Sequence, residues 1–443
     1  MDFTHDKTIV NIVLTVTKIL RNLHFCFWYN VKSLNKHTVF CILTFNKKFS
    51  DIGESSMKKN VVLLLVALMV VSLLFCVSCN KKESSSDSIK IGFIGPLTGD
   101  YANYGTLCKQ AVQMAVEEIN AKGGINGVQI KLYAEDSEGD SQKALAAMEK
   151  LSSSDGVCAV IGPVLTGESF SVAERAQAEG IVIITPSASH KDITNVGDYI
   201  FRTTPSDGLQ GEVAGKYWYQ VLGYRKLAVL YAKNDYSQGL YESMSEAFSE
   251  DGGEIVATET FMVGDKDFKT QLTNLKNTDA EAIYIPDYTA EMAQILEQAA
   301  QLGIDKPFLS SDGFLSEEIY TLAGQYTDGV VYTASAKIEE SDLTKIFKEN
   351  YTAKWGVGPD SFASNAYDAT YILASVIEKV GTDRKAIKEG MQQVKDFEGV
   401  NGIINFAENG DLVASQGIYK VEGTTPVYIG AFKVENGKVV QVQ

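Results

Sequence analysis

Hydroxyl and carboxylate side chains follow short apolar runs at three points of this chain, where they could bind a small polar molecule. Thr166 comes after the strand-like run 158–161 and precedes a helical segment. A threonine at a helix N-cap lies beside free backbone N–H groups and the positive end of the helix dipole, which favour an anion. Ser187 and Ser189 follow another apolar run and Pro186, and Asp312 stands in a Ser-Ser-Asp-Gly sequence after a third run. Ordinary caps and turns have the same composition, so both interpretations stay open at this point.

The ionisable residues give little support to catalysis. Of four histidines only His190 lies beyond residue 79, which excludes a multi-histidine metal site from the remainder of the chain. Asp136, Asp287 and Asp312 could be arranged as acid–base pairs, but no nucleophile elbow, phosphate loop or metal-ligand set accompanies them. We therefore predict that the protein is not an enzyme and needs neither a metal nor a cofactor.

Length and charge indicate the general class of the protein. A chain of 443 residues suggests two domains, and a net charge of −16 argues against nucleic acid as a partner. Residues 1–79 hold nine Lys or Arg against four Asp or Glu, whereas the remainder is strongly acidic. A basic leader before an acidic body is typical of an export signal followed by an exported domain.

The N-terminal region has the layout of a lipoprotein signal. Met57, Lys58 and Lys59 precede the apolar run 61–75, and Cys79 follows Ser78 directly. This resembles a bacterial lipobox, although Cys76 stands where leucine is usual, and it implies cleavage before Cys79 and lipidation of its thiol. We predict a non-native upstream extension at 1–56, a signal peptide at 57–79 and a tether at 80–88. An uncleaved membrane anchor is the alternative, because the apolar run approaches the roughly 20 residues of a membrane-spanning helix.

The body alternates strand-like and helix-like segments. The expected strands are 89–94, 128–133, 158–161, 181–184, 226–231, 255–260, 282–285 and 308–310, and the expected helices are 105–121, 141–151, one from 167, 208–222, 238–250, 268–276, 290–302, 342–355 and 361–380. The pattern restarts after residues 201–205, and shorter β segments close the chain at 416–421 and 427–434. This repetition predicts an α/β fold with two doubly wound parallel-sheet lobes. Parallel sheets bind ligands at the carboxyl ends of their strands, so the expected site is the cleft between the lobes.

Four short motifs occur in order along this body. They are Gly-Phe-Ile-Gly-Pro-Leu-Thr-Gly at 92–99, Glu-Ile-Asn-Ala-Lys-Gly-Gly-Ile-Asn-Gly at 118–127, Ile-Thr-Pro-Ser-Ala-Ser at 184–189 and Arg-Thr-Thr-Pro at 202–205. Together they resemble the Leu/Ile/Val-binding family of type I periplasmic solute-binding proteins, over some four-fifths of the chain. The resemblance implies one lobe from 89–205 plus 336–405 and a second from 206–335 plus 406–443. It also implies a hinge of three crossovers, near 204–207, 332–336 and 406–416.

The same resemblance implies an extracytoplasmic lipoprotein that binds an amino acid, with Leu, Ile or Val first, for an ABC importer. The expected partners are the permease subunits, and the lipid anchor is expected to attach the protein to the membrane. The protein is expected to be a monomer. It would lie in the cell envelope and face the periplasm or the exterior. An aromatic amino acid, amide, short peptide or aromatic acid, bound for transport or sensing, is the alternative. A single-chain receptor would need a further membrane span, and a transcription regulator would need a DNA-binding headpiece.

Residue by residue, the resemblance assigns roles to the polar side chains named above. Thr166 would hold the ligand carboxylate, Ser187 and Ser189 would meet the carboxylate and ammonium, and Asp312 would neutralise the ammonium.

Aromatic rings would frame the ligand. Tyr104 would line the first lobe and Tyr236 and Tyr288 would close from the second, since a tyrosine ring adds apolar area while its hydroxyl finds a polar partner. Phe362 and Tyr367 are the weaker pocket candidates.

One departure from the family concerns cysteine. Leu165 stands where well-studied members have a disulfide-forming cysteine, so that disulfide is absent. Cys108 and Cys158 are the cysteines beyond residue 79, and two separate buried thiols are favoured over a bridge between them.

Overall fold

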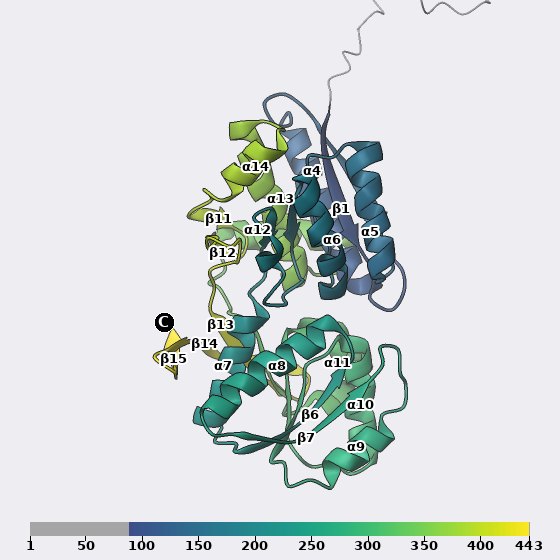
Figure 1. Ribbon diagram of the computed structural model, residues 1–443, viewed down its shortest axis with the longest axis vertical. Helices are drawn as coiled ribbons and strands as arrows, with labels where there is room; N and C mark the ends of the chain where they lie inside the picture. The colour runs from purple at the N-terminus through teal and green to yellow at the C-terminus, as the bar shows by residue number, and fades with distance from the viewer. Residues whose placement is uncertain (1–87, 443) are drawn as a thin grey trace, which may run out of the picture. The chain divides into compact units, whose positions relative to one another are not determined.

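The computed structural model describes residues 88–442, which belong to one compact unit (Figure 1). The predictions for the upstream extension, the signal peptide, Cys79 and the tether up to residue 87 lie outside the described residues. Between residues 88 and 442, no helix combines the length and apolar character needed to cross a bilayer.

The first lobe is built on a five-stranded parallel sheet with the order β2-β1-β3-β4-β5. Its strands are β1 (Ile89–Gly95), β2 (Ile130–Asp136), β3 (Ala159–Ile161), β4 (Val182–Thr185) and β5 (Ile200–Arg202). Adjacent residues of β3 pack on opposite faces of the sheet. Ile161 packs with α4 (Ala102–Ala121) and α13 (Ser361–Val380). Val160 packs with α5 (Ser141–Glu149) and α6 (Thr166–Glu179). Burial on both faces explains why β3 and β4 are apolar at nearly every position.

Later segments complete this lobe. They are α12 (Asp342–Trp355), α14 (Arg384–Met391) and the hairpin of β11 (Phe397–Gly399) and β12 (Gly402–Ile404). Cys108 and Cys158 are both buried there as free thiols, which confirms two separate cysteines.

The second lobe contains an eight-stranded sheet with the order β15-β14-β13-β10-β9-β8-β6-β7. The parallel strands of this sheet are β6 (Lys226–Ala232), β7 (Glu254–Phe261), β8 (Ala282–Ile285), β9 (Phe308–Ser310) and β10 (Val331–Ser335). The helices of this lobe are α7 (Asp207–Gln220), α8 (Asp235–Glu250), α9 (Lys269–Lys276), α10 (Thr289–Gln301) and α11 (Glu318–Leu322). Helices α7 and α8 cover one face with Trp218 and Phe248, and α9 and α10 cover the other with Leu272 and Ile295. The predicted α/β architecture is confirmed.

The C-terminal strands depart from the purely parallel expectation. The strands β13 (Gln416–Glu422), β14 (Thr425–Glu435) and β15 (Lys438–Val442) extend the sheet in antiparallel pairing. Asn436 and Gly437 both adopt positive φ, at 52° and 73°, which gives the tight turn between β14 and β15 its hairpin geometry. A two-residue connection permits only an antiparallel return, because parallel strands need a long crossover.

The chain passes between the two sheets three times. It leaves the first sheet after β5, returns toward α12 after β10, and crosses again before β13 (Figure 1). The first and third passages meet, because the backbone N–H of Arg202 donates to the Gly410 carbonyl at 3.1 Å.

Candidate functional site

Thr166 differs from the prediction in its position on the helix. Leu165, with extended backbone at φ −92° and ψ 151°, is the N-cap of α6, and Thr166 is the first helical residue. The prediction that Thr166 caps the helix is therefore wrong. The backbone N–H of Leu165 donates to the Glu168 carboxylate at 3.4 Å. The capping hydrogen bond at this end of α6 therefore does not involve the Thr166 hydroxyl. Thr166 is 1% exposed, and its hydroxyl has no hydrogen-bond partner among residues 88–442.

The loop after β4 carries the two predicted serines. The Thr185 hydroxyl accepts hydrogen bonds from the backbone N–H groups of Ala188 at 2.9 Å and Ser187 at 3.4 Å, which turns the chain after the strand. Ser187 is half-buried, whereas Ser189 is 1% exposed. The Ser189 hydroxyl, like that of Thr166, is unpartnered within the described part of the chain. Buried hydroxyls are usually hydrogen-bonded, so each of these two could receive a polar group of a ligand. Other buried hydroxyls of the described chain, among them Ser137 and Thr333, also have no partner, so this property alone does not mark the site.

Asp312 lies past the end of β9 and is held by two side chains of the second lobe. Its Oδ1 accepts hydrogen bonds from the Tyr236 hydroxyl at 2.6 Å and from Gln210 Nε2 at 2.9 Å. The amide of Gln416 donates to Gln210 Oε1 at 2.8 Å, which fixes the orientation of Gln210. Asp312 is 5% exposed, and burial raises the pKa of its carboxyl while the two hydrogen bonds lower it. A cation beside Asp312 would stabilise its ionised form.

Tyrosine rings connect the lobes. Tyr288 stacks on Tyr236 with ring centroids 4.7 Å apart, and its ring also meets Tyr104 edge-on at 5.6 Å. The Tyr104 hydroxyl, from the first lobe, lies 2.8 Å from the Thr289 hydroxyl and donates to the Gly313 carbonyl at 3.4 Å in the second. The two lobes are thus in direct contact through side chains that lie beside Tyr236, a hydrogen-bond donor to Asp312.

The weaker pocket candidates separate in the structure. Phe362 is buried, and its ring centroid lies 5.9 Å from that of Tyr104, so it joins the tyrosine cluster. Tyr367 instead packs against Phe347, and its hydroxyl donates to Glu118 Oε2 at 2.6 Å in the interface between α13 and α4. The structure therefore brings Tyr104, Tyr236, Tyr288, Asp312 and Phe362 together and leaves Tyr367 outside the group.

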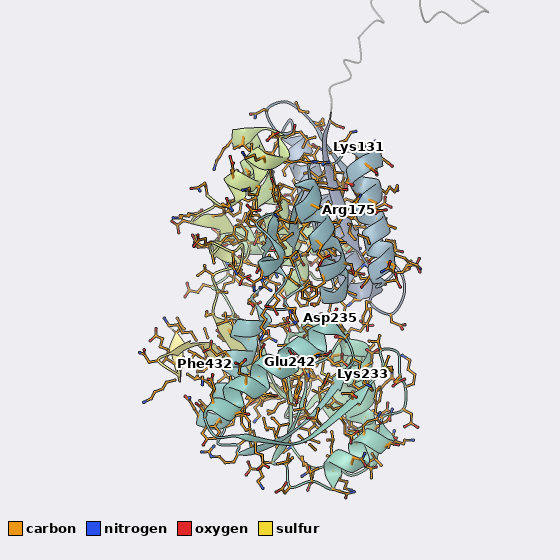
Figure 2. All side chains as sticks on the ribbon, viewed as in Figure 1. Lys131, Arg175, Lys233, Asp235, Glu242 and Phe432 are labelled. Atoms are coloured by element: carbon orange, nitrogen blue, oxygen red, sulfur yellow. The ribbon has the colours of Figure 1, made fainter. Side chains whose placement is uncertain are left out.

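Helix α8 approaches the first lobe at its N-terminal end. A Cβ on Gly239 would lie 2.3 Å from Cδ2 of His190, so glycine is needed there for the close approach of this helix. Asp235, at the start of α8 (Figure 2), has a carboxylate oxygen 3.2 Å from the position of a Cβ on Gly167 of α6. The starts of α6 and α8, which carry Thr166 and Tyr236, therefore face each other at short range.

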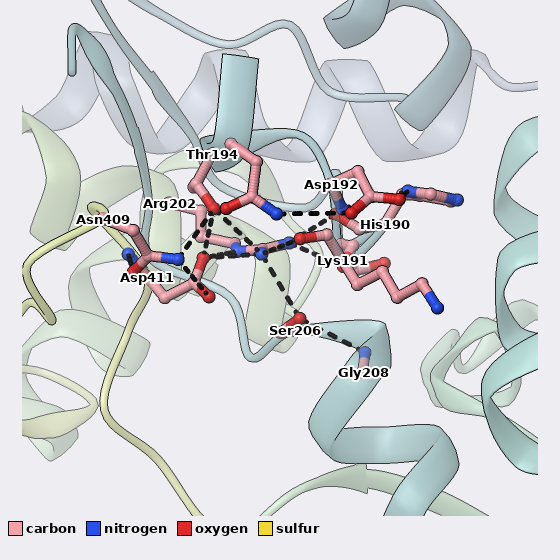
Figure 3. A network of polar contacts seen from close by, with 11 residues as sticks. His190, Lys191, Asp192, Thr194, Arg202, Ser206, Gly208, Asn409 and Asp411 are labelled. Carbon is pink, nitrogen blue, oxygen red and sulfur yellow. Dashed lines mark hydrogen bonds and ion pairs between the residues drawn. The ribbon is translucent and has the colours of Figure 1, made fainter. Parts of the chain in front are cut away.

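Arg202 organises the first-lobe part of the site and was not predicted as a site residue. Its side chain is completely buried, and it donates to the Ser189 carbonyl at 2.6 Å and the His190 carbonyl at 2.9 Å. It also forms an ion pair with Asp411 at 2.6 Å and donates to Ser206 Oγ at 3.3 Å (Figure 3). One guanidinium group thus ties the Ser189 loop to the first and third passages between the lobes.

A separate cavity of about 570 Å³ opens beside the passages between the lobes. It is lined by Thr203, Ala336, Asn365 and Leu412, among others, and by none of the sequence-predicted site residues. Over the described range, no group of three or more His, Cys, Asp or Glu side chains is placed to hold a metal ion.

Comparison with known proteins gives a consistent family. The family described as periplasmic binding protein matches residues 88–425. The Leucine-, isoleucine-, valine-, threonine-, and alanine-binding protein of Pseudomonas aeruginosa is 33% identical over 330 residues, which are 74% of this chain and 88% of that protein.

Solved structures agree with the sequence relatives. The substrate-binding protein LivJ of Streptococcus pneumoniae, in complex with isoleucine, has a TM-score of 0.72 and 33% identity, and the match covers 80% of this chain and all of LivJ. A solute-binding protein of R. palustris in complex with benzoate also has a TM-score of 0.72, over 80% of this chain and 98% of that one, but at 22% identity it shows the fold alone. The chain belongs to the Leu/Ile/Val-binding family of type I periplasmic binding proteins.

Proposed function

We propose that this protein is the extracytoplasmic solute-binding lipoprotein of an ABC importer, and that it binds an amino acid between its two lobes. The observation that carries the proposal is the contact of Tyr104 with Thr289 and Gly313. We infer that this contact holds the lobes closed around a site that includes the buried hydroxyls of Thr166 and Ser189, which have no hydrogen-bond partner in the described chain. The N-terminal end of α6 suits the ligand carboxylate, and Asp312 suits the ammonium.

Closure of a hinge supplies the mechanism. The three passages after β5, after β10 and before β13 would allow the lobes to open, which would break the Tyr104 contacts and expose Thr166 and Ser189 to solvent. A ligand that touches both lobes binds the closed form better than the open form, so it shifts the population toward closure. The permease subunits would then recognise the closed form.

Branched-chain amino acids are the leading ligands in this proposal. The relatives named for Leu, Ile and Val share about a third of their residues with this chain over most of its body. Tyr104, Tyr288 and Phe362 offer an apolar surface for such a side chain. One methylene in a pocket changes the binding free energy by only about 1–3 kcal/mol, so the choice among these three ligands requires measurement.

We expect a thermal-shift screen to identify the ligand class. A chain beginning at Asn80 retains residues 88–442 and would be tested with the twenty amino acids, amides, short peptides and aromatic acids. A ligand of about micromolar Kd should raise the melting temperature clearly at about millimolar concentration. Stabilisation by Leu, Ile or Val supports the proposal. Stabilisation only by compounds without an α-amine would contradict amino-acid binding and the role given to Asp312.

Cys79 should attach the protein to the membrane. The chain would be expressed with Met57 as its first residue in cells that are supplied with a radioactive fatty acid. The wild-type chain is expected to carry the label and to lie in the membrane fraction. Cys79→Ala is expected to lose the label. Cys76→Ala, three residues earlier in the same signal, is the matched control and should stay labelled. Equal labelling of the wild-type chain and Cys79→Ala would show that Cys79 is not the lipidated residue.

A further inference from the structure

His190 is a first-lobe residue whose ring contacts the second lobe. It lies in the loop after β4, and its side chain is 14% exposed. A Cβ on Gly239 of α8 would lie 2.3 Å from His190 Cδ2 and 2.8 Å from Nε2, so the imidazole ring rests directly on the backbone of that helix. On its first-lobe side the ring meets the uncharged ring of Phe170 from α6 edge-on, with centroids 5.0 Å apart. Separation of the lobes would therefore expose the imidazole to solvent.

The contacts of His190 in the closed lobes suit a neutral ring. Its Nδ1 accepts a hydrogen bond from the backbone N–H of Asp192 at 3.2 Å, and only an unprotonated ring nitrogen can accept. A proton on Nδ1 would set two N–H groups against each other and would place a charge where little water can reach it. The backbone of His190 is held in place by Arg202, which donates to its carbonyl at 2.9 Å (Figure 3).

The charged groups around His190 act on its pKa in opposite directions. Burial is the largest influence and lowers the pKa of His190. The carboxylates of Asp192 in the same loop and of Asp235 and Glu242 on α8 (Figure 2) raise it, and Lys191 lowers it. The net effect is a pKa below the ordinary value, so the three carboxylates only partly offset the burial.

Opening of the lobes would remove the burial that lowers this pKa. An exposed histidine has a pKa of about 6.5, so the open form would bind a proton below that pH more readily than the closed form. Protonation favours the form with the higher pKa, so the closed form loses stability relative to the open form as the pH falls below about 6.5. Well above that pH the ring is neutral in both forms and has no effect on closure.

We propose that His190 couples ligand binding to pH, because closure of the lobes expels its proton and mild acid, at about pH 5–6, favours the open form and release of the ligand. This inference rests on the proposed function and adds a regulation of the same site. Gly239 is part of the coupling, since a larger residue there would hold His190 and α8 apart.

The first test compares the wild-type protein with His190→Asn. Asparagine offers the Asp192 N–H an acceptor but does not titrate. Calorimetry between about pH 5.5 and 7.5, on either side of the ordinary histidine pKa, would measure the affinity for the amino acid that stabilises the wild-type protein most. Two buffers of different ionisation enthalpy would give the protons released on binding. Asp312 and the other carboxylates titrate in both proteins, so the difference between the two isolates His190.

We expect the wild-type affinity to fall by about three- to tenfold more than that of His190→Asn over this range, where an open-form pKa of about 6.5 sets the upper limit. At about pH 6 the wild type should also release more protons on binding than the variant. Equal pH profiles and equal proton release would overturn the inference. A wild-type affinity that rises in acid relative to the variant would overturn it as well, because the carboxylates of α8 would then stabilise protonated His190 in the closed form.

The second test asks whether the contact between His190 and α8 governs closure. Gly239→Ala should weaken binding of the same amino acid by at least about fivefold, because its Cβ overlaps the imidazole when the lobes meet. The ligand-free variant should melt at the same temperature or higher, since alanine favours a helix over glycine. Adding His190→Ala vacates the space and should restore part of the affinity. Gly358→Ala is the control, because a Cβ there would meet nothing within 4 Å.

The outcomes separate this inference from the proposed function. If Gly239→Ala binds as tightly as Gly358→Ala, the contact does not limit closure and the inference is wrong, while amino-acid binding stands. A wild-type protein that binds no amino acid at any pH would overturn the proposed function, and this inference with it.

Discussion

Replacing Asp312 with asparagine should weaken binding of a free amino acid by at least about tenfold, which is about 1.4 kcal/mol. Asparagine keeps an oxygen that can accept the hydrogen bonds of Tyr236 and Gln210, so the change removes charge and leaves the local geometry in place. Removing one partner of a buried charge pair leaves the other without compensation, at a cost of roughly 2–5 kcal/mol. Asp312→Ala should lose at least as much, because Tyr236 and Gln210 also lose their acceptor.

The control for this prediction is Asp305→Ala, an exposed aspartate in the turn before β9. Calorimetric titration with the amino acid identified in the screen should give a wild-type Kd for the control. Melting temperatures of the ligand-free variants would show whether the fold is intact. If Asp312→Asn and Asp305→Ala bind equally well, Asp312 does not contact the ligand ammonium.

The elements of the fold could be predicted from local sequence because their signals are local. The apolar runs that became β8 and β9 and the long segments that became α12 and α13 have the predicted bounds. The antiparallel strands β13 and β14 were expected as β segments, but β15 and the pairing of the three strands were not predicted. The turn residues Asn436 and Gly437 carried that information, since Asn-Gly between alternating segments favours a tight hairpin.

The sequence pattern alone could predict only part of the arrangement of the site residues. Asp312 could be proposed from its position after a strand, yet its partner Gln210 stands 102 residues earlier and the two meet only through the fold. Phe362 and Tyr367 occur on one helix five positions apart, and at 3.6 residues per turn they lie on different faces. Phe362 consequently faces Tyr104, whereas Tyr367 faces Glu118.

Arg202 had a sequence signal that was used only for the family resemblance. It begins the motif Arg-Thr-Thr-Pro at 202–205, which lies between the end of β5 and the start of α7. Which acceptors Arg202 would satisfy depends on Asp411, more than 200 residues away, so its role required the structure.

Arg202→Met should be the most destabilising of the substitutions considered for this protein, at about 3–5 kcal/mol of unfolding free energy. Methionine fills much of the volume but leaves Asp411 charged and the Ser189 and His190 carbonyls without their donor. Urea unfolding followed by circular dichroism would measure the loss. Arg175→Met on α6 (Figure 2) is the matched control, because Arg175 is an arginine with ion pairs to Glu149 and Glu179 but a partly exposed side chain, and its loss should cost less than about 1 kcal/mol.

The contacts of Arg202 also predict which substitutions would restore part of the stability that Arg202→Met loses. Adding Asp411→Asn to Arg202→Met removes the carboxylate charge that the first substitution left unpaired, so the double variant should be more stable than Arg202→Met alone. Arg202→Lys keeps a charge for Asp411 but lacks the planar fork that also reaches the Ser189 and His190 carbonyls. Compared with Arg202→Met, the Arg202→Lys variant should therefore regain more unfolding free energy than ligand affinity, because the Ser189 loop still lacks hydrogen bonds to the guanidinium group. If stability and affinity recovered together, Arg202 would support the fold without positioning the ligand loop.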